Sequence, residues 1–209
     1  QFSKDSRYRT ELYKLRRKFM SHADGLIHAD LHTSNILASR DEMKVIDMEF
    51  AFMGPFGYDL GYLVGNLISQ YCAACFKRFP SEQNRKQFKA YLLATIKSLI
   101  ETYMKTFTLC WERSVKERYR GQQGLLQSIL QEVMVDMPGY ASMVNWFRSV
   151  SDIPYPDFDV IENKDAKRNA TVLSLMIDWG IMFGRYKYQS ADDLIETIIG
   201  IEEEFRKSL

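Results

Sequence analysis

The 209-residue sequence predicts a mainly α-helical protein that carries one small β-hairpin, an α+β arrangement. Apolar residues recur at helical spacing through most of the chain. A short β-rich segment, residues 26–50, has β-branched side chains beside a polar connection of hairpin length. Hydrophobic residues make up 46% of the chain and charged residues 26%. This composition is typical of a globular protein with a real core and excludes a disordered chain.

Charge and cysteine content limit the partners and the compartment. Lys and Arg number 28 against 27 Asp and Glu, so the formal net charge is only +1. We therefore expect no nucleic-acid partner and no attraction to an acidic membrane surface. Apolar runs of membrane length and a secretion-type N-terminus are not found in the sequence. Three cysteines in 209 residues fit a reducing compartment, so a cytoplasmic location is expected, and Cys72 and Cys75 are interpreted as buried thiols.

The first predicted elements are an amphipathic helix and the β-rich segment. In the helix, apolar side chains repeat at helical intervals among Arg and Lys, which gives it a basic outer face. The segment 26–50 is expected to run as loop, strand, turn, strand and loop, with residues 40–42 as the connection. Residues 54–57 contain two glycines and a proline, and they are expected to break any regular element.

The rest of the chain is predicted to be helical. Ser81 is a candidate N-cap for a long amphipathic helix, and Ser190 with Asp193 is a candidate cap for the last one. Residues 151–164 contain two prolines and are expected to form a surface loop. The expected helices are residues 60–76, 82–118, 124–137 (ended by Pro138 and Gly139), 165–187 and 191–207.

The segment "HADLHTSNIL", residues 28–37, concentrates polar side chains that suit phosphoryl transfer. It places Asp30 five residues before Asn35, and Asp47 and Glu49 follow at the end of the second predicted strand. An alcohol nucleophile needs a carboxylate that orients it and accepts its proton, and phosphates need Mg²⁺, which prefers carboxylate and amide oxygens. A hairpin between Asn35 and Asp47 would bring both to one side, because adjacent antiparallel strands end together.

These motifs resemble those of the kinase-like small-molecule phosphotransferases, the group of aminoglycoside phosphotransferases, choline kinases and methylthioribose kinases. "HADLHTSNIL" is similar to their catalytic loop, and "VIDMEFAFMGPFGYDLG" to their metal-binding segment. In methylthioribose kinases the loop reads H-G-D-L-H-T-G-S-I, and the second motif is D-x-E-F-A followed by G-P-x-G-(F/Y)-D. The resemblance implies the C-terminal lobe of the protein-kinase-like fold over residues 1–209, with catalytic and metal loops at 28–59 and a helical substrate-binding subdomain at about 60–209.

The resemblance also implies roles for the acidic residues. Asp30 would be the catalytic base and Asp47 the principal Mg²⁺ ligand, with Glu49 as a second acidic contributor. Asn35 stands where the methylthioribose pattern has Ser, and it would either ligate the metal or orient Asp30. Asp59, in "GYDLG", would brace the catalytic loop, although an N-cap role for the next helix is an alternative.

Two histidines and one arginine complete the candidate site. His28 is expected to support the catalytic loop, and His32 to contact substrate. Further along, "DMPGYASMVNWFRSVSDIPYPDFD" is similar to a segment that carries twin arginines for the sugar in methylthioribose kinases. Arg148 matches the second arginine, whereas Phe147 stands at the place of the first. Arg148 is thus a candidate substrate-binding residue, and a surface salt bridge is its alternative role.

The implied activity is transfer of the γ-phosphate of ATP, with Mg²⁺, to a hydroxyl of a small sugar, first of all methylthioribose in methionine salvage. Aminoglycoside- or choline-type alcohols, and a non-catalytic kinase-like binding module, are the alternatives. A dinuclear metal hydrolase is disfavoured because all three histidines precede residue 33. The oligomeric state stays open, with a homodimer among the candidates.

Such a kinase also needs a glycine-rich loop and a strand lysine that hold the nucleotide phosphates. Residues 1–27 contain one glycine, Gly25, and no strand pattern around a lysine. We therefore expect the N-terminal nucleotide lobe to be absent from these 209 residues, as in an isolated lobe or a truncated product. Alone, the chain is expected to have little or no kinase activity.

Overall fold

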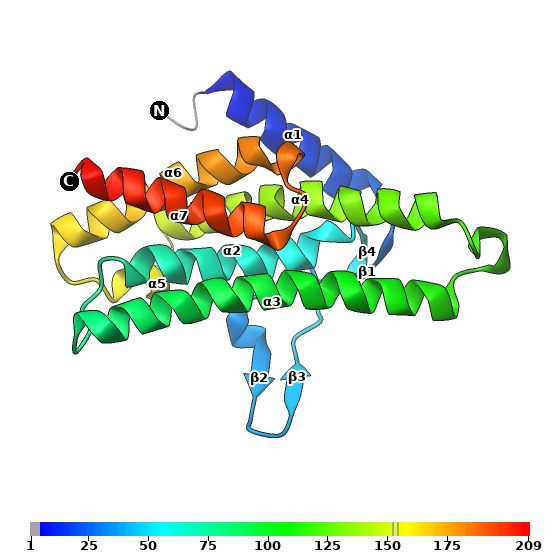
Figure 1. Ribbon diagram of the computed structural model, residues 1–209, viewed down its shortest axis with the longest axis horizontal. Coiled ribbons are helices and arrows are strands. Elements are labelled where there is room, and N and C mark those ends of the chain that lie inside the picture. The colour runs from blue at the N-terminus through cyan, green and yellow to red at the C-terminus, as the bar shows by residue number, and fades with distance from the viewer. Residues whose placement is uncertain (1–4, 152, 154) are drawn as a thin grey trace.

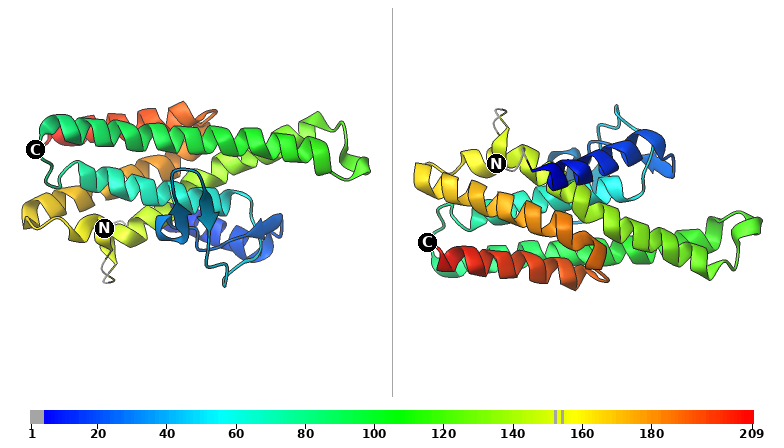
Figure 2. Two further views of the ribbon diagram at one scale, coloured as in Figure 1. Left: turned by 90° about the horizontal axis from the view of Figure 1, so that it is seen from below. Right: turned by 90° about the horizontal axis from the view of Figure 1, so that it is seen from above.

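The computed structural model describes residues 5–151, 153 and 155–209. Long helices form the body of the molecule, and a thin β-hairpin projects from it (Figure 1). Helices α3 and α7 run side by side along one edge, and α1 lies on the opposite side (Figure 2). The helices are α1 (Ser6–Ser21), α2 (Gly57–Ala74), α3 (Glu82–Ser114), α4 (Gln123–Val150), α5 (Pro156–Asp159), α6 (Lys164–Gly184) and α7 (Ala191–Lys207), with single 3₁₀ turns at Thr33–Asn35, Glu117–Tyr119 and Arg185–Lys187.

In the described part of the chain, four short strands form two antiparallel pairs. The predicted hairpin is confirmed as β2 (Ile36–Ala38) and β3 (Met43–Val45), joined through residues 39–42. The second pair, β1 (Gly25–Ile27) with β4 (Phe52–Gly54), was not predicted. The expectation that residues 54–57 exclude regular structure is wrong at both ends: Gly54 pairs with Gly25 at the end of β4, and Gly57 is the first residue of α2. Two glycines facing each other across the pair give no β-branched signal in the sequence.

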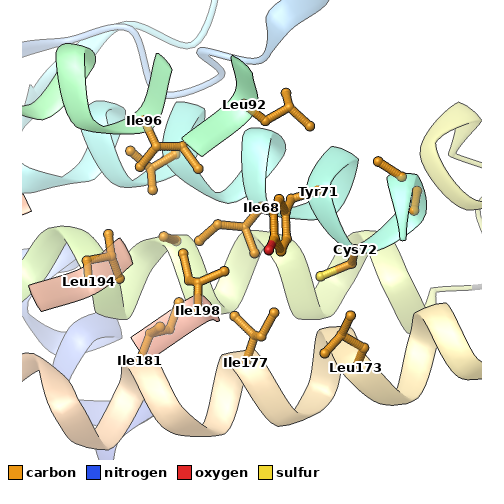
Figure 3. Close-up of a cluster of buried hydrophobic side chains, with 14 of the residues drawn as sticks. Ile68, Tyr71, Cys72, Leu92, Ile96, Leu173, Ile177, Ile181, Leu194 and Ile198 are labelled. Carbon is orange, nitrogen blue, oxygen red and sulfur yellow. The ribbon is translucent and has the colours of Figure 1, made fainter. Parts of the chain in front are cut away.

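The hydrophobic core surrounds α2, which is buried on most of its faces. Apolar side chains of α2 point toward those of α6 and α7, and α3 closes the other side (Figure 3). A smaller cluster under α1 joins Tyr8 and Leu15 to Tyr140 of α4 and Met182 of α6. The amphipathic character predicted for the first helix is thus confirmed. The central cluster includes Ile68, Tyr71, Cys72, Leu92, Ile96, Leu173, Ile177, Ile181, Leu194 and Ile198.

Helices α2 and α4 approach each other closely because α2 presents glycines at the contact. A Cβ on Gly61 would lie 2.6 Å from the carbonyl oxygen of Met137. A Cβ on Gly65 would lie 2.6 Å from the carbonyl oxygen of Ala141. A side chain cannot be placed at either position without moving backbone, so the two glycines set the spacing that positions the start of α2 beneath the catalytic loop.

The predicted helix end at Pro138 and Gly139 is wrong, because α4 continues through both residues to Val150. A proline inside a helix removes one backbone donor and disturbs the preceding turn. Here the guanidinium of Arg185 donates to the carbonyl oxygen of Val135, at 3.1 Å, and so provides a donor in that turn. Gly139 has Leu15 and Arg185 against its Cα, where a side chain would collide. Tertiary packing therefore overrides the local signal.

Several smaller expectations have definite outcomes. Helix α3 ends at Ser114 rather than 118, and α6 ends at Gly184 rather than 187. Residues 151–164 are not only loop, since they include α5, and Phe158 and Ile161 are buried. Cys72 and Cys75 are buried free thiols, as predicted. The predicted cap of α7 is present as a capping box between Ser190 and Asp193. In the described part of the chain, no helix is both long and apolar enough to cross a membrane.

Candidate active site

The catalytic loop starts where β1 ends, and the first turn of α2 anchors it. The backbone N–H groups of His28 and Ala29 donate to the two carboxylate oxygens of Asp59, at 2.6 and 2.9 Å. Asp59 lies inside α2, whose N-cap position is Phe56, so its carboxylate faces the loop and does not cap its own helix. The bonds fix the position of the loop relative to the core helix.

Backbone strain is concentrated at the two predicted functional loops. Among the described residues, only Ala29 and Asp47 combine a side chain with a positive φ, 68° and 65°. Such angles cost of order 1–2 kcal/mol for a residue with a Cβ, and they persist only where surrounding bonds impose them. At Ala29 the bond to Asp59 imposes it. One unusual conformation lies directly before Asp30, and the other is at Asp47 itself.

His28 connects the two loops. Its Nε2–H donates to the carbonyl oxygen of Ile46 at 2.8 Å, and its Nδ1 accepts from the backbone N–H of Asp30 at 3.3 Å. These bonds require the neutral imidazole with its proton on Nε2. His28 is buried and both of its ring nitrogens form hydrogen bonds. It therefore holds Ile46, the residue before Asp47, close to Asp30, the candidate base.

The carboxylate of Asp30 has two different surroundings. One oxygen, Oδ1, accepts a hydrogen bond from the hydroxyl of Tyr62 at 2.9 Å. The other, Oδ2, lies 3.5 Å from Nε2 of His32, and the side chains of Asp30 and His32 are each 28% exposed. Burial and the hydrogen bond to Asp30 raise the pKa of Tyr62, so it stays a donor at neutral pH. One oxygen of Asp30 is therefore held by Tyr62, while the side chain as a whole remains partly exposed.

The hairpin brings Asn35 and Asp47 together at its base. The N–H of Ile46 donates to the backbone carbonyl of Asn35 at 3.0 Å, directly beyond the β2–β3 pair. The Nδ2 of Asn35 donates to the carbonyl oxygen of Asp30 at 3.1 Å, so its Oδ1 is the atom that could meet a cation. Asp47 is exposed at the end of the hairpin, and Glu49 is exposed in the turn that follows.

This donor set fits Mg²⁺ bound together with phosphates. Among the described residues, no three His, Cys, Asp or Glu side chains gather closely enough to hold a metal ion by themselves. Mg²⁺ is usually bound by one or two carboxylates plus substrate phosphates and water, and not by a complete protein cage. The hard oxygens of Asp47 and Asn35 at the open hairpin base match that pattern, with Glu49 nearby in sequence.

An aromatic cavity of about 430 Å³ adjoins Asp30. Tyr62 lines this cavity and also bonds to Asp30, so it connects the two. Arg148 lines the cavity as well, but its guanidinium pairs with the buried Asp157 at 2.6 Å and stacks over Tyr155. Arg148 faces the cavity while it forms an ion pair, but the surface salt bridge expected as its alternative role is wrong, because the side chains of Arg148 and Asp157 are only 12% and 3% exposed.

Reasoning from sequence missed several residues at this site. Tyr62 lies in the helix expected over residues 60–76 and has no predicted role at the site, and Tyr58, one turn earlier, also lines the cavity. Arg16 of α1 lines it too, although the basic face of that helix was interpreted as a solvated surface. Tyrosines four residues apart, on either side of the predicted brace Asp59, were the available signal, because a buried tyrosine hydroxyl needs a partner.

The residues that form this site also match known protein families. Residues 5–99 match the model of the phosphotransferase enzyme family. This range contains every loop residue described above and the start of α2. This part of the chain is therefore similar to a family of phosphotransferases.

Within that class, the similar curated proteins are methylthioribose kinases. The one from Geobacillus thermodenitrificans (strain NG80-2) is 32% identical over 198 residues, which cover 95% of this chain and 48% of the relative. The one from Geobacillus kaustophilus (strain HTA426) is 33% identical over 190 residues, 91% of this chain and 46% of the relative. The one from Exiguobacterium sibiricum is 35% identical over 137 residues. The chain thus spans about half the length of the curated relatives it matches, as the resemblance to a C-terminal lobe implied.

Proposed function

We propose that the protein containing these residues is an ATP- and Mg²⁺-dependent kinase that phosphorylates a sugar hydroxyl, with methylthioribose as the first candidate acceptor. The observation that carries the proposal is the state of Asp30. Its Oδ1 accepts from Tyr62, its side chain is 28% exposed, and it adjoins both an aromatic cavity and the base of the hairpin that bears Asp47. This is the arrangement that a base for an alcohol nucleophile needs.

In the proposed reaction Asp30 orients the acceptor hydroxyl and takes its proton. The acceptor oxygen forms a bond to the γ-phosphorus as the bond between that phosphorus and the β–γ bridging oxygen breaks, and ADP leaves. Asp47 and the Oδ1 of Asn35 would hold Mg²⁺, which supplies neutralisation of the phosphate charge. Glu49 would assist at the metal, and His32, 3.5 Å from Asp30, would contact the acceptor.

The remaining candidate residues would hold the two loops or the acceptor in place. His28 would keep the two loops together, and Asp59 would brace the catalytic loop from α2. Arg148 would contact the acceptor from the cavity wall while Asp157 holds its guanidinium. The glycine-rich loop and the phosphate-binding lysine would come from outside these 209 residues, which is why the chain alone is expected to be inactive. The activity would serve methionine salvage, and the sparse cysteines support a cytoplasmic setting as part of the proposal.

The test is an acceptor screen on the complete protein, with ADP release measured in the presence of ATP and Mg²⁺. We expect turnover with methylthioribose or another 5-substituted ribose, and none with the Asp30→Ala variant. Turnover with choline or aminoglycosides alone would keep the phosphotransferase chemistry and reject the sugar. If no acceptor gives turnover and no Mg²⁺-dependent nucleotide binding is detected, the non-catalytic binding module replaces the proposal.

A further inference from the structure

The cavity beside Asp30 has the size and the lining of a binding site for an apolar group. Small-molecule sites in proteins span about 300–1,000 Å³ and are mostly apolar with a few polar groups. This cavity measures about 430 Å³, and eight of its thirteen lining residues are aromatic. They come from α1, α2, α4 and the residue before α5, and they include Tyr13, Phe19, Tyr62, Trp146, Phe147 and Tyr155.

The position of the cavity determines which part of an acceptor would enter it. Tyr62 forms part of the wall and donates to Asp30 through the same hydroxyl. An acceptor whose hydroxyl meets Asp30 would therefore direct the rest of its structure along the aromatic wall. Phe147 is 45% exposed and packs edge-on against Tyr155, with ring centroids 6.0 Å apart, so it stands at the mouth of the cavity.

The charges of the lining argue against a cationic acceptor. Of the described residues that line the cavity, two are cationic, Arg16 and Arg148, and none carries a carboxylate. Asp157 neutralises Arg148, and the ring of Tyr155 covers its guanidinium at 4.5 Å. Aromatic walls alone can hold a quaternary ammonium, but here the nearby guanidinium of Arg16 would repel one. A strongly polar polyol would also meet few donors along the aromatic wall.

We infer, on the basis of the proposed function, that the acceptor is a neutral sugar with an apolar substituent packed against Trp146, Phe147 and Tyr155, and that the site favours alkyl or aryl substituents longer than the methyl group of methylthioribose. The aromatic wall selects acceptors by the length of that substituent. The hydroxyl that reacts stays at Asp30, and the polar ring of the sugar lies between Asp30 and the aromatic wall that holds the substituent.

The test measures binding to the 209-residue chain by titration calorimetry, with 5-thioriboses that carry methyl, propyl and pentyl groups, and with choline. Affinity should rise about three- to fourfold for each added methylene, the factor expected for burying one methylene group. Phe147→Ser should remove most of this increase, whereas the matched variant Phe147→Leu should retain it. Phe147 is half exposed, so both variants should fold, and their helical circular dichroism serves as the check.

A dissociation constant that does not change with chain length, choline binding that is tighter than that of the pentyl compound, or no binding of any compound would overturn the inference. Turnover of the complete protein separates this result from the proposed function. Length-dependent binding without Asp30-dependent turnover supports the cavity assignment and rejects the kinase. Asp30-dependent turnover that is equal for methyl and pentyl compounds supports the kinase and rejects the cavity assignment.

Discussion

The residue Asp59 shows how a single carboxylate can organise a catalytic loop from a distance. It accepts both N–H groups at the start of the loop and imposes the positive φ of Ala29. The loop therefore depends on a side chain that lies thirty-one residues further along the chain than His28. Replacing this acceptor should loosen the loop and cost stability at the same time.

We expect Asp59→Ala to lower the free energy of unfolding by about 1.5–3 kcal/mol, the range for hydrogen bonds to a charged group. Asp59→Asn keeps one carbonyl acceptor and should lose less. Urea unfolding of the three proteins measures the difference. A variant Asp59→Ala as stable as the wild type would show that the loop is held by other contacts.

Asp178 provides a second prediction at the scale of the residue. It is fully buried, its Oδ1 accepts from Asn145 at 2.7 Å, and its Oδ2 has no hydrogen-bond partner among the described residues. Burial raises the pKa of Asp178 well above its ordinary value, and the bond from Asn145 opposes this only in part. The folded state thus keeps a proton that the unfolded state releases above about pH 4.

Stability contributed by Asp178 is therefore lost as the pH rises above that value, at up to about 1.4 kcal/mol per pH unit. Asp178→Asn is nearly isosteric and does not titrate. Relative to the wild type, this variant should gain stability as the pH rises from 4 to 8, which thermal unfolding across that range measures. Parallel curves for the two proteins would mean that Asp178 ionises in the folded state at its ordinary pKa.

At the scale of elements, the contact between α2 and α4 determines where the catalytic loop is anchored. Because Gly61 and Gly65 of α2 have no side chain, the backbone of α4 can approach them closely. A Cβ at either position would lie 2.6 Å from a carbonyl oxygen of α4. Asp59 lies at the start of the same helix. A change in this spacing would therefore move the loop as well as the core.

We expect Gly65→Ala to destabilise the fold by about 2 kcal/mol or more, because its Cβ would meet the carbonyl oxygen of Ala141 at 2.6 Å. Gly200→Ala in α7 is the matched control. A Cβ there meets nothing within 4 Å, so this helical substitution should stabilise by about 0.5–1 kcal/mol. Chemical denaturation compares both with the wild type, and equal effects of the two substitutions would contradict the close packing of α2 on α4.

Elements formed by neighbouring residues could be predicted from the sequence, whereas elements that depend on distant residues could not. The hairpin β2–β3 was predictable because its β-branched residues and its polar connection are neighbours in the chain. The pair β1–β4 was not, because its strands are separated by twenty-four residues and contain facing glycines. Likewise, the end of α4 could not be predicted from Pro138, because the donor that supports this turn, Arg185, comes from beyond α6.

The candidate site divides in the same way. Asp30, Asn35 and Asp47 could be proposed as site residues from the sequence, since each belongs to a local motif, and their roles stay predictions. Tyr62, Arg16 and the aromatic wall were not, because their role depends on which helices pack around Asp30. In the sequence, a tyrosine at a site and an ordinary core aromatic residue have the same helical spacing. Only the folded structure shows which group the tyrosine hydroxyl bonds to.

At the scale of the whole molecule, ion pairs connect the outer helices to the core. Glu202 of α7 is buried and accepts from Tyr71 of α2, Lys89 of α3 and Arg206 of its own helix. Burial alone would raise the pKa of Glu202, but these three donors outweigh it and hold the pKa at about 2. The folded pKa therefore lies below the unfolded value of 4.5.

The stability that Glu202 contributes is present above pH 4.5 and is lost as the pH falls toward 2. Glu202→Gln should cost about 2–4 kcal/mol at pH 7, because Lys89 would lose the partner of a buried pair. The difference from the wild type should shrink as the pH falls to 3. Unfolding measured at pH 7 and pH 3 checks this, and a constant difference would contradict the role given to the ionised carboxylate.

The most direct test of the central claim is the rate of phosphate transfer by the complete protein with Asp30 changed to Asn. Asp41→Asn, on the exposed hairpin connection, is the matched control. We predict that Asp30→Asn lowers kcat by at least about 100-fold, the loss expected for a general base, while nucleotide affinity and the control's rate stay unchanged. Turnover by Asp30→Asn at the wild-type rate would contradict the assignment of Asp30 as the base.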